Sequence, residues 1–173
     1  MKRLILIACA ALISLASFAQ KYDTDFSQTR RLKVSGRTST MKGHLTFDGK
    51  ENLAMNYSDP EGDYFVIDGN MVKLNLQGKK AEMDATKVAM VTLQRSTLLN
   101  CLTGNWEQAA KDNNATTEVT EKTGFRTVKI TAGGVIPRGG YKAVILTYRI
   151  KDGRLKRLVL EEPAGIENTY EIQ

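Results

Sequence analysis

The amino-acid sequence predicts a mainly β domain of the α+β class, an unclosed antiparallel β-barrel of about ten strands with a helical lid or plug inserted mid-chain. Three observations lead to this prediction. Runs of β-favouring residues alternate with tight turn signals in both the N-terminal and the C-terminal parts of the chain. Helical periodicity interrupts them once, in the middle. A sheet of so many strands rarely stays flat, so we expect it to curl, with the helices closing one side.

The N-terminal residues have the pattern of a secretory signal peptide. Met1-Lys2-Arg3 is positively charged, residues 4–18 are uncharged and mainly apolar, and small residues precede a cut at Gln20. The uncharged run stops after 15 residues, whereas a membrane-spanning helix needs about 20. We therefore expect an exported, periplasmic protein that is cleaved after Ala19, with residues 20–173 as a single domain. Lipidation at Cys9 is a minor alternative.

The charge of the chain is positive but dispersed. Its 25 Lys and Arg residues and 19 Asp and Glu residues give a formal net charge of +6, and the loss of Lys2 and Arg3 with the signal peptide lowers it to +4. Because the positive residues do not cluster, we expect no nucleic-acid partner. The densest basic positions, 30–31 and 154–157, are interpreted as solvated outward-facing charges, with a role at an anionic surface as the alternative.

The two cysteines exclude an intramolecular disulfide in the mature chain. Cys9 lies in the predicted signal peptide, so Cys101 remains alone. We expect Cys101 to be a small, buried, apolar residue on a helix, since a free cysteine usually packs in this way.

The first half of the mature chain contains six runs with strand character. The clearest section is Leu53–Leu76, where alternating apolar residues are separated by the turn signals of residues 59–62 and by Asp68-Gly69. The six predicted strands span residues 26–34, 41–47, 53–58, 64–67, 71–76 and, as an edge strand, 79–84. This order of strands and tight turns predicts a β-meander.

The period of the apolar residues lengthens from about Ala85. Apolar residues recur there at helical steps of three and four, and Gly104 provides a stop. A second short helix is predicted over residues 106–111. The chain then returns to strands, predicted over residues 116–121, 126–131, 141–150, 155–161 and 168–172. In the strand 155–161, alternation places Leu155 and Val159 on the face opposite to Leu158.

The sequence contains no convincing catalytic or metal-binding set, so we predict a protein that is not an enzyme and has no cofactor. The only histidine, His44, falls on the strand face opposite to Leu45 and Phe47 and is expected at the surface. An exported hydrolase that uses His44 is the weakest alternative.

The carboxylates between Asp59 and Asp68 follow turn chemistry and lack the spacing of a calcium loop. Residues 133–140 are rich in glycine but lack the Lys-Ser/Thr pair of a phosphate-binding loop, and are interpreted as an inter-strand loop.

Four short motifs in the first half resemble a known family. They are Phe26-Ser27-Gln28, the Lys-Gly-His-Leu of residues 42–45, the segment of residues 53–60 that ends in Tyr-Ser-Asp-Pro, and the Val-Ile-Asp-Gly-Asn of residues 66–70. In this order and spacing they resemble the outer-membrane lipoprotein carrier family, LolA. The resemblance rests on motifs between Phe26 and Leu76, and on the order of strands and helices beyond them. One departure is that Ala54 and Met55 stand where the family typically has an Arg-Trp pair.

The resemblance implies a periplasmic carrier that holds the acyl chains of lipoproteins, or another lipid, in an apolar half-barrel cavity. It also implies transient contact with an inner-membrane export complex and an outer-membrane acceptor, and we expect a monomer. The alternative is a related sensor or scaffold module that binds a protein partner. The candidate cavity residues are Leu45, Phe47, Leu53, Met55, Tyr57, Phe65, Ile67, Leu74 and Leu76 from the strands, with Val88, Val91, Leu98 and Leu99 from the lid.

Overall fold

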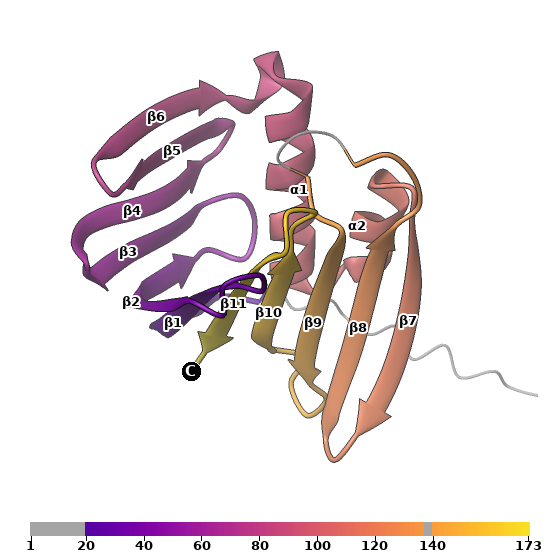
Figure 1. The fold of residues 1–173 in the computed structure, drawn as a ribbon. Coiled ribbons are helices and arrows are strands. Elements are labelled where there is room, and N and C mark those ends of the chain that lie inside the picture. The colour runs from indigo at the N-terminus through magenta and orange to yellow at the C-terminus, as the bar shows by residue number, and fades with distance from the viewer. Residues whose placement is uncertain (1–19, 137–139) are drawn as a thin grey trace, which may run out of the picture.

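The protein folds around one curved antiparallel sheet (Figure 1). The computed structural model describes residues 20–136 and 140–173, so the predicted signal peptide, residues 1–19, lies outside the described residues. The strands are β1 (Tyr22–Leu32), β2 (Thr38–Phe47), β3 (Leu53–Asp59), β4 (Glu61–Asp68), β5 (Met71–Leu76), β6 (Lys79–Asp84), β7 (Ala115–Lys122), β8 (Phe125–Ala132), β9 (Ala143–Arg149), β10 (Leu155–Glu161) and β11 (Ile166–Ile172).

The sheet is open, which confirms the predicted unclosed barrel. Its order is β6-β5-β4-β3-β2-β1-β11-β10-β9-β8-β7, so β6 and β7 are the two edges. The first and last strands, β1 and β11, pair in the middle of the sheet. Figure 1 shows the sheet curving around α1 (Ala89–Thr103), which lies between the wing that ends at β6 and the wing that ends at β7. The described part of the chain forms eleven strands, where about ten were predicted.

Short turns create most of these pairings, as the sequence predicts. Between β2 and β3, the Asp48 carboxylate accepts hydrogen bonds from the backbone N–H groups of Lys50 at 2.7 Å and Asn52 at 3.1 Å. Between β4 and β5, Gly69 adopts a positive φ of 53°, a conformation that glycine tolerates at no steric cost. The predicted edge strand over residues 79–84 is confirmed as β6.

The first strand differs from its prediction at both ends. It begins at Tyr22, four positions before the predicted start, and ends at Leu32. Tyr22 pairs with Phe47 of β2, and both side chains are buried, so the strand extends as far as its inner face can pack against the core.

The alternation predicted for strand 155–161 is wrong. A bulge between Leu155 and Arg157 shifts the register of β10 against β9, since Leu155 pairs with Tyr148 while Arg157 pairs with Thr147. The extra residue moves the following side chains to the other face of the sheet. Leu155 and Leu158 therefore lie together in the core, although simple alternation places them on opposite faces.

The helical insert is split into three pieces. A short 3-10 helix (Ala85–Lys87) precedes α1, and Asp84 caps it by accepting a hydrogen bond from the N–H of Thr86 at 3.0 Å. Gly104 ends α1 in the left-handed conformation with φ of 82°, as its position predicts. The second helix, α2 (Trp106–Asp112), follows directly. No helix of the described residues is both long and apolar enough to span a membrane.

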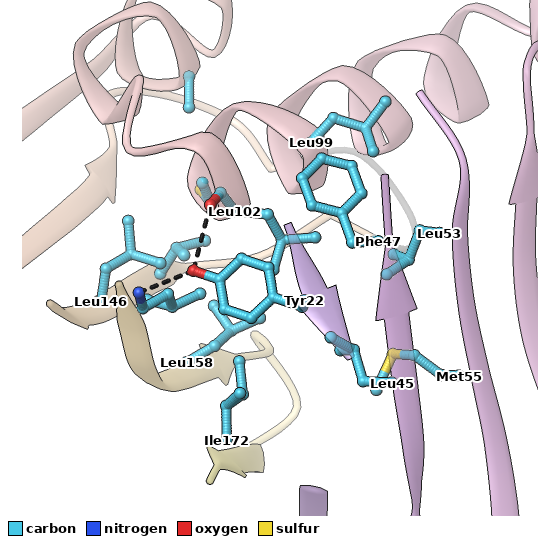
Figure 2. Packing of buried hydrophobic residues seen from close by; sticks show 14 of the residues in the cluster. Tyr22, Leu45, Phe47, Leu53, Met55, Leu99, Leu102, Leu146, Leu158 and Ile172 are labelled. Atoms are coloured by element: carbon cyan, nitrogen blue, oxygen red, sulfur yellow. Dashed lines mark hydrogen bonds between the residues drawn. The ribbon is translucent and has the colours of Figure 1, made fainter. Parts of the chain in front are cut away.

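The packed part of the core lies where the last turns of α1 meet the sheet. Figure 2 shows Leu99 and Leu102 of α1 beside Tyr22, Phe47 and Leu53 of the strands. These five side chains are at most 8 % exposed. Close packing at this end of the helix fixes α1 against the concave face. The rest of that face is not covered by these side chains.

Candidate functional site

A cavity of about 500 Å³ lies between the concave face of the sheet and α1. Its origin is geometric. Eleven strands spaced about 4.8 Å apart make a surface on the order of 50 Å wide, whereas one helix with its side chains is only about 10 Å across. A single helix therefore cannot fill the concave face. A cavity of this size falls within the range of natural small-molecule sites.

One wall of the cavity is apolar and comes from residues predicted from the sequence. Alternate positions of β2 to β5 face inward, because neighbouring residues of a strand point to opposite faces. Eight of the predicted residues line this cavity: Leu45, Leu53, Met55, Tyr57, Phe65, Leu74 and Leu76 from the strands, and Leu98 from α1. Ala54 is on the other face of β3 from Met55, so the two positions of the family's Arg-Trp pair point in opposite directions.

The remaining predicted residues lie elsewhere. Val91 lines a smaller cavity of about 150 Å³ that shares Phe65, Leu74 and Leu98 with the larger one. Phe47, Ile67 and Leu99 belong to the packed core and line neither cavity. Val88 precedes α1, is 44 % exposed and also lines neither.

The cavity is also lined by polar side chains that the sequence prediction missed. We call these residues the polar wall, and they are Gln28 of β1, Asp63 of β4, Glu162, and Asn168 and Tyr170 of β11. The Tyr57 hydroxyl donates a hydrogen bond to Oε1 of Gln28 at 2.5 Å. The backbone N–H of Gln77 donates to both carboxylate oxygens of Asp63 at 2.9 Å.

Three residues of the polar wall, Gln28, Asp63 and Asn168, are buried. Gln28 and Asp63 are only 6 % and 7 % exposed. Burial, with a smaller contribution from the charge of Asp63, raises the pKa of Tyr57 to about 12. Burial also raises the pKa of Tyr141, with a further contribution from Glu162. The tyrosines are therefore neutral at physiological pH and serve as hydrogen-bonding groups.

A sequence signal for the polar wall existed in β1. Phe26, Gln28 and Arg30 occupy alternate positions, so a buried Phe26 implies that the other two face the same side. Polar residues on an inward face disagree with the pattern of a solid core. Polar residues in such positions indicate a cavity.

His44 lies away from the cavity, on the outer face of β2. Its two ring nitrogens are 2.7 Å from carboxylate oxygens of Asp23 and Asp25, and its side chain is 47 % exposed. Among residues 20–136 and 140–173, no group of three or more His, Cys, Asp and Glu side chains is arranged to hold a metal ion.

Cys101 is buried on α1, as predicted, with an exposed fraction of 1 %. Burial raises the pKa of its thiol to about 12. A neutral, inaccessible thiol packs as a small apolar side chain, because the reactive form of cysteine is the thiolate.

The described groups thus surround a cavity with many apolar side chains and a smaller number of hydrogen-bonding groups. Large apolar cavities with a few convergent polar groups are the usual form of a small-molecule site.

Comparison with solved structures finds proteins of similar arrangement and very low sequence identity. A LolA superfamily protein of Nitrosomonas europaea matches with 8 % identity over 90 % of this chain and 84 % of that chain, at a TM-score of 0.39. The lipoprotein LppX of Mycobacterium tuberculosis matches with 14 % identity over 87 % and 85 %, at 0.29. The MucA/MucB complex of Pseudomonas aeruginosa matches with 9 % identity over 90 % of this chain and 52 % of that chain, at 0.45. No curated protein matches the sequence significantly.

The sequence itself identifies the family. Residues 17–173 match the family described as outer membrane lipoprotein carrier protein LolA, and the match spans nearly the whole chain, including every strand and helix described above. The protein therefore belongs to the LolA family.

Proposed function

We propose that the protein is a periplasmic carrier that binds the acyl chains of lipoproteins, or of another lipid, inside the half-barrel. The observation that carries this proposal is the cavity of about 500 Å³ with an apolar wall of leucine, methionine and phenylalanine side chains. An acyl chain is the natural occupant of such a space, because each buried CH₂ group contributes about 0.8 kcal/mol.

A carrier must also release its cargo, and the geometry is compatible with release. Exposed residues of β1, β2 and β6, namely Arg30, Ser39 and Lys79, line the same cavity as the buried leucines, so the cavity reaches the surface. We call this open end the mouth. A chain that enters through the mouth can leave by the same path without unfolding of the sheet.

The family membership supports a transport route through the periplasm. On this proposal the protein is exported by residues 1–19, receives cargo from an inner-membrane export complex and delivers it to an outer-membrane acceptor. Fractionation of native cells and N-terminal sequencing test the first step. We expect mature protein in the periplasmic fraction with Gln20 as its first residue, and a cytoplasmic protein that starts at Met1 would contradict it.

The cargo is tested by mass spectrometry of protein purified from its native host without detergent. We expect lipid to be extracted from the wild-type protein and to be strongly reduced in Leu74→Asn, which places an amide in the apolar wall. Val119→Asn is the matched control, because Val119 is 46 % exposed on the edge strand β7 and does not line the cavity. Thermal unfolding of both variants verifies that each is folded.

Two outcomes would contradict the carrier proposal. Wild-type protein free of lipid would remove its basis, and stable cross-linking to a protein partner in the absence of lipid would favour a sensor or scaffold module instead. Equal lipid content in Leu74→Asn and the wild type would show that the lipid binds outside the cavity.

A further inference from the structure

The charged groups that line the large cavity divide into two classes. The negative groups have donors within the protein: Asp63 accepts from the N–H of Gln77, and Glu162 accepts from Nδ2 of Asn168 at 2.9 Å. The positive groups, Arg30 and Lys79, have no acidic partner of this kind. Within the described part of the chain, neither has a carboxylate oxygen within 4.0 Å of its charged nitrogens.

Strand register places these cations at the mouth. Arg30 lies near the end of β1, opposite Ser39 of β2 and Asn168 of β11, and both partners also line the cavity. Lys79 is the first residue of the edge strand β6 and pairs with Leu76. In the sheet order, four strands separate β1 from β6 (Figure 1), and residues of both strands line the same cavity.

Two residues of the polar wall, Gln28 and Tyr170, have hydrogen-bond donors without acceptors. Tyr57 donates to the oxygen of the Gln28 side-chain amide, which leaves the Nε2 hydrogens of Gln28 available. Neither this nitrogen nor the hydroxyl of Tyr170 has a hydrogen-bond partner among residues 20–136 and 140–173, and neither atom is sealed from solvent. Gln28 and Tyr170 are cross-strand partners in the register of β1 and β11. Their free donors therefore face the cavity side by side.

We infer that the mouth forms a headgroup site for an anionic amphiphile, with Arg30 and Lys79 attracting its carboxylate or phosphate and the free donors of Gln28 and Tyr170 bonding to it. The chain of the same molecule lies against Leu74 and Phe65. An anionic head would supply acceptors for the two unpaired cations and the two free donors, while the apolar side chains of the same cavity would contact the chain. Anionic oxygens are the acceptors that form the strongest bonds with such groups.

This inference rests on the proposed function and adds the chemical class of the cargo's head. It predicts a preference among amphiphiles that share one chain. Hydrogen bonds to a charged group are stronger than those between neutral groups by an amount equivalent to about tenfold in affinity. We therefore expect dodecanoate and dodecyl phosphate to bind about tenfold more tightly than dodecanol, and dodecylamine to bind most weakly.

The experiment is displacement of the apolar fluorescent probe 1-N-phenylnaphthylamine from the purified protein by these four amphiphiles, each below its micelle concentration. Arg30→Gln and Lys79→Gln are the test variants. Arg31→Gln and Lys80→Gln are matched controls, because each removes a neighbouring charge on the same strand from a residue that does not line the cavity. The test variants should lose the preference for anionic heads and retain binding of dodecanol, while the controls should keep the wild-type order.

The outcomes separate the two proposals. If none of the amphiphiles displaces the probe from the wild type or from any variant, the acyl-carrier function fails and the headgroup site fails with it. If all four bind equally, or if Arg30→Gln and Arg31→Gln change the order alike, the carrier function stands and the headgroup site is overturned. Displacement by inorganic phosphate as strong as that by dodecyl phosphate would identify a site for free phosphate and would also overturn the amphiphile assignment.

Discussion

The hydroxyl oxygen of Tyr22, the first residue of β1, accepts a hydrogen bond from the backbone N–H of Leu155, the first residue of β10, at 2.9 Å. The proton of the same hydroxyl has two acceptors within reach, the carbonyl oxygen of Leu102 on α1 at 3.4 Å (Figure 2) and Oε1 of Gln20 at 3.3 Å. Residues far apart in the sequence thus meet at one buried oxygen. This contact joins the two halves of the sheet to the helix that forms the roof of the cavity.

Tyr22→Phe is expected to lower the free energy of unfolding by about 1–3 kcal/mol, because it leaves the buried N–H of Leu155 without this acceptor. Urea denaturation monitored by circular dichroism measures the change. Tyr64→Phe is the control, since the Tyr64 hydroxyl on β4 has no hydrogen-bond partner within the described residues. Its effect should stay within about 0.5 kcal/mol. Equal losses in the two variants would refute the role of the Tyr22 hydroxyl.

Gly43→Ala is expected to destabilise the half-barrel by about 1–3 kcal/mol. A Cβ at position 43 would lie 2.9 Å from Cα of Tyr57 and would also collide with the carbonyl oxygen of Asn56, and backbone atoms of β3 cannot rotate away. The same residue lies beside the edge-to-face pair of Phe26 and Tyr57, whose ring centroids are 5.2 Å apart.

Gly134→Ala provides the comparison for Gly43→Ala. A Cβ at Gly134 meets no atom within 4 Å, and this glycine does not have a positive φ. The melting temperature of Gly134→Ala should equal that of the wild type or be slightly higher, because alanine reduces the conformational freedom of the unfolded chain. A melting temperature of Gly43→Ala equal to that of Gly134→Ala would contradict the predicted clash.

His44 should make stability depend on pH. Hydrogen bonds from the ring to Asp25 and then Asp23 raise the pKa of His44 above its ordinary value of 6.5. The folded protein therefore holds this proton more tightly than the unfolded chain does. The resulting stabilisation is fully present below about pH 6.5 and is lost as the pH rises through the raised pKa.

The His44→Gln variant isolates this effect in urea denaturation between about pH 5 and pH 9. The wild type should be more stable than the variant at the acid end, and the difference should shrink toward the alkaline end. A difference that stays constant over this range, or that grows with pH, would rule out the linkage. Because His44 is on the outer face, binding of the fluorescent probe should be the same in the variant and the wild type.

Much of the fold could be predicted because it depends on local signals. Turn chemistry at Asp48 and Asp68-Gly69 sets hairpins between adjacent strands, and Gly104 ends the helix where its conformation allows. These features need only the residues next to them. The bulge after Leu155 could not be predicted, because strand alternation carries no mark of an inserted residue until the partner strand fixes the register.

The cavity was predicted less completely than the fold. Alternation identifies Leu74 and Phe47 equally well as inward-facing residues, yet Leu74 lines the cavity and Phe47 fills the core. The difference depends on where α1 lies over the sheet. Gln28 was missed for the same reason, since a polar residue on an inner face acquires its role only when the helix leaves space beside it.

The sequence by itself determined the class of the fold, the order of its strands and helices, the inward faces of β2 to β5 and the LolA family. Only the tertiary structure decided that β1 meets β11 and that α1 packs firmly at its last turns. It also decided that the remaining space is lined by leucines together with Gln28, Asp63 and Tyr170. The physical reason is that hydrophobic periodicity records which side of an element is buried. It does not record whether that side meets another side chain or an open space, which depends on elements distant in the sequence.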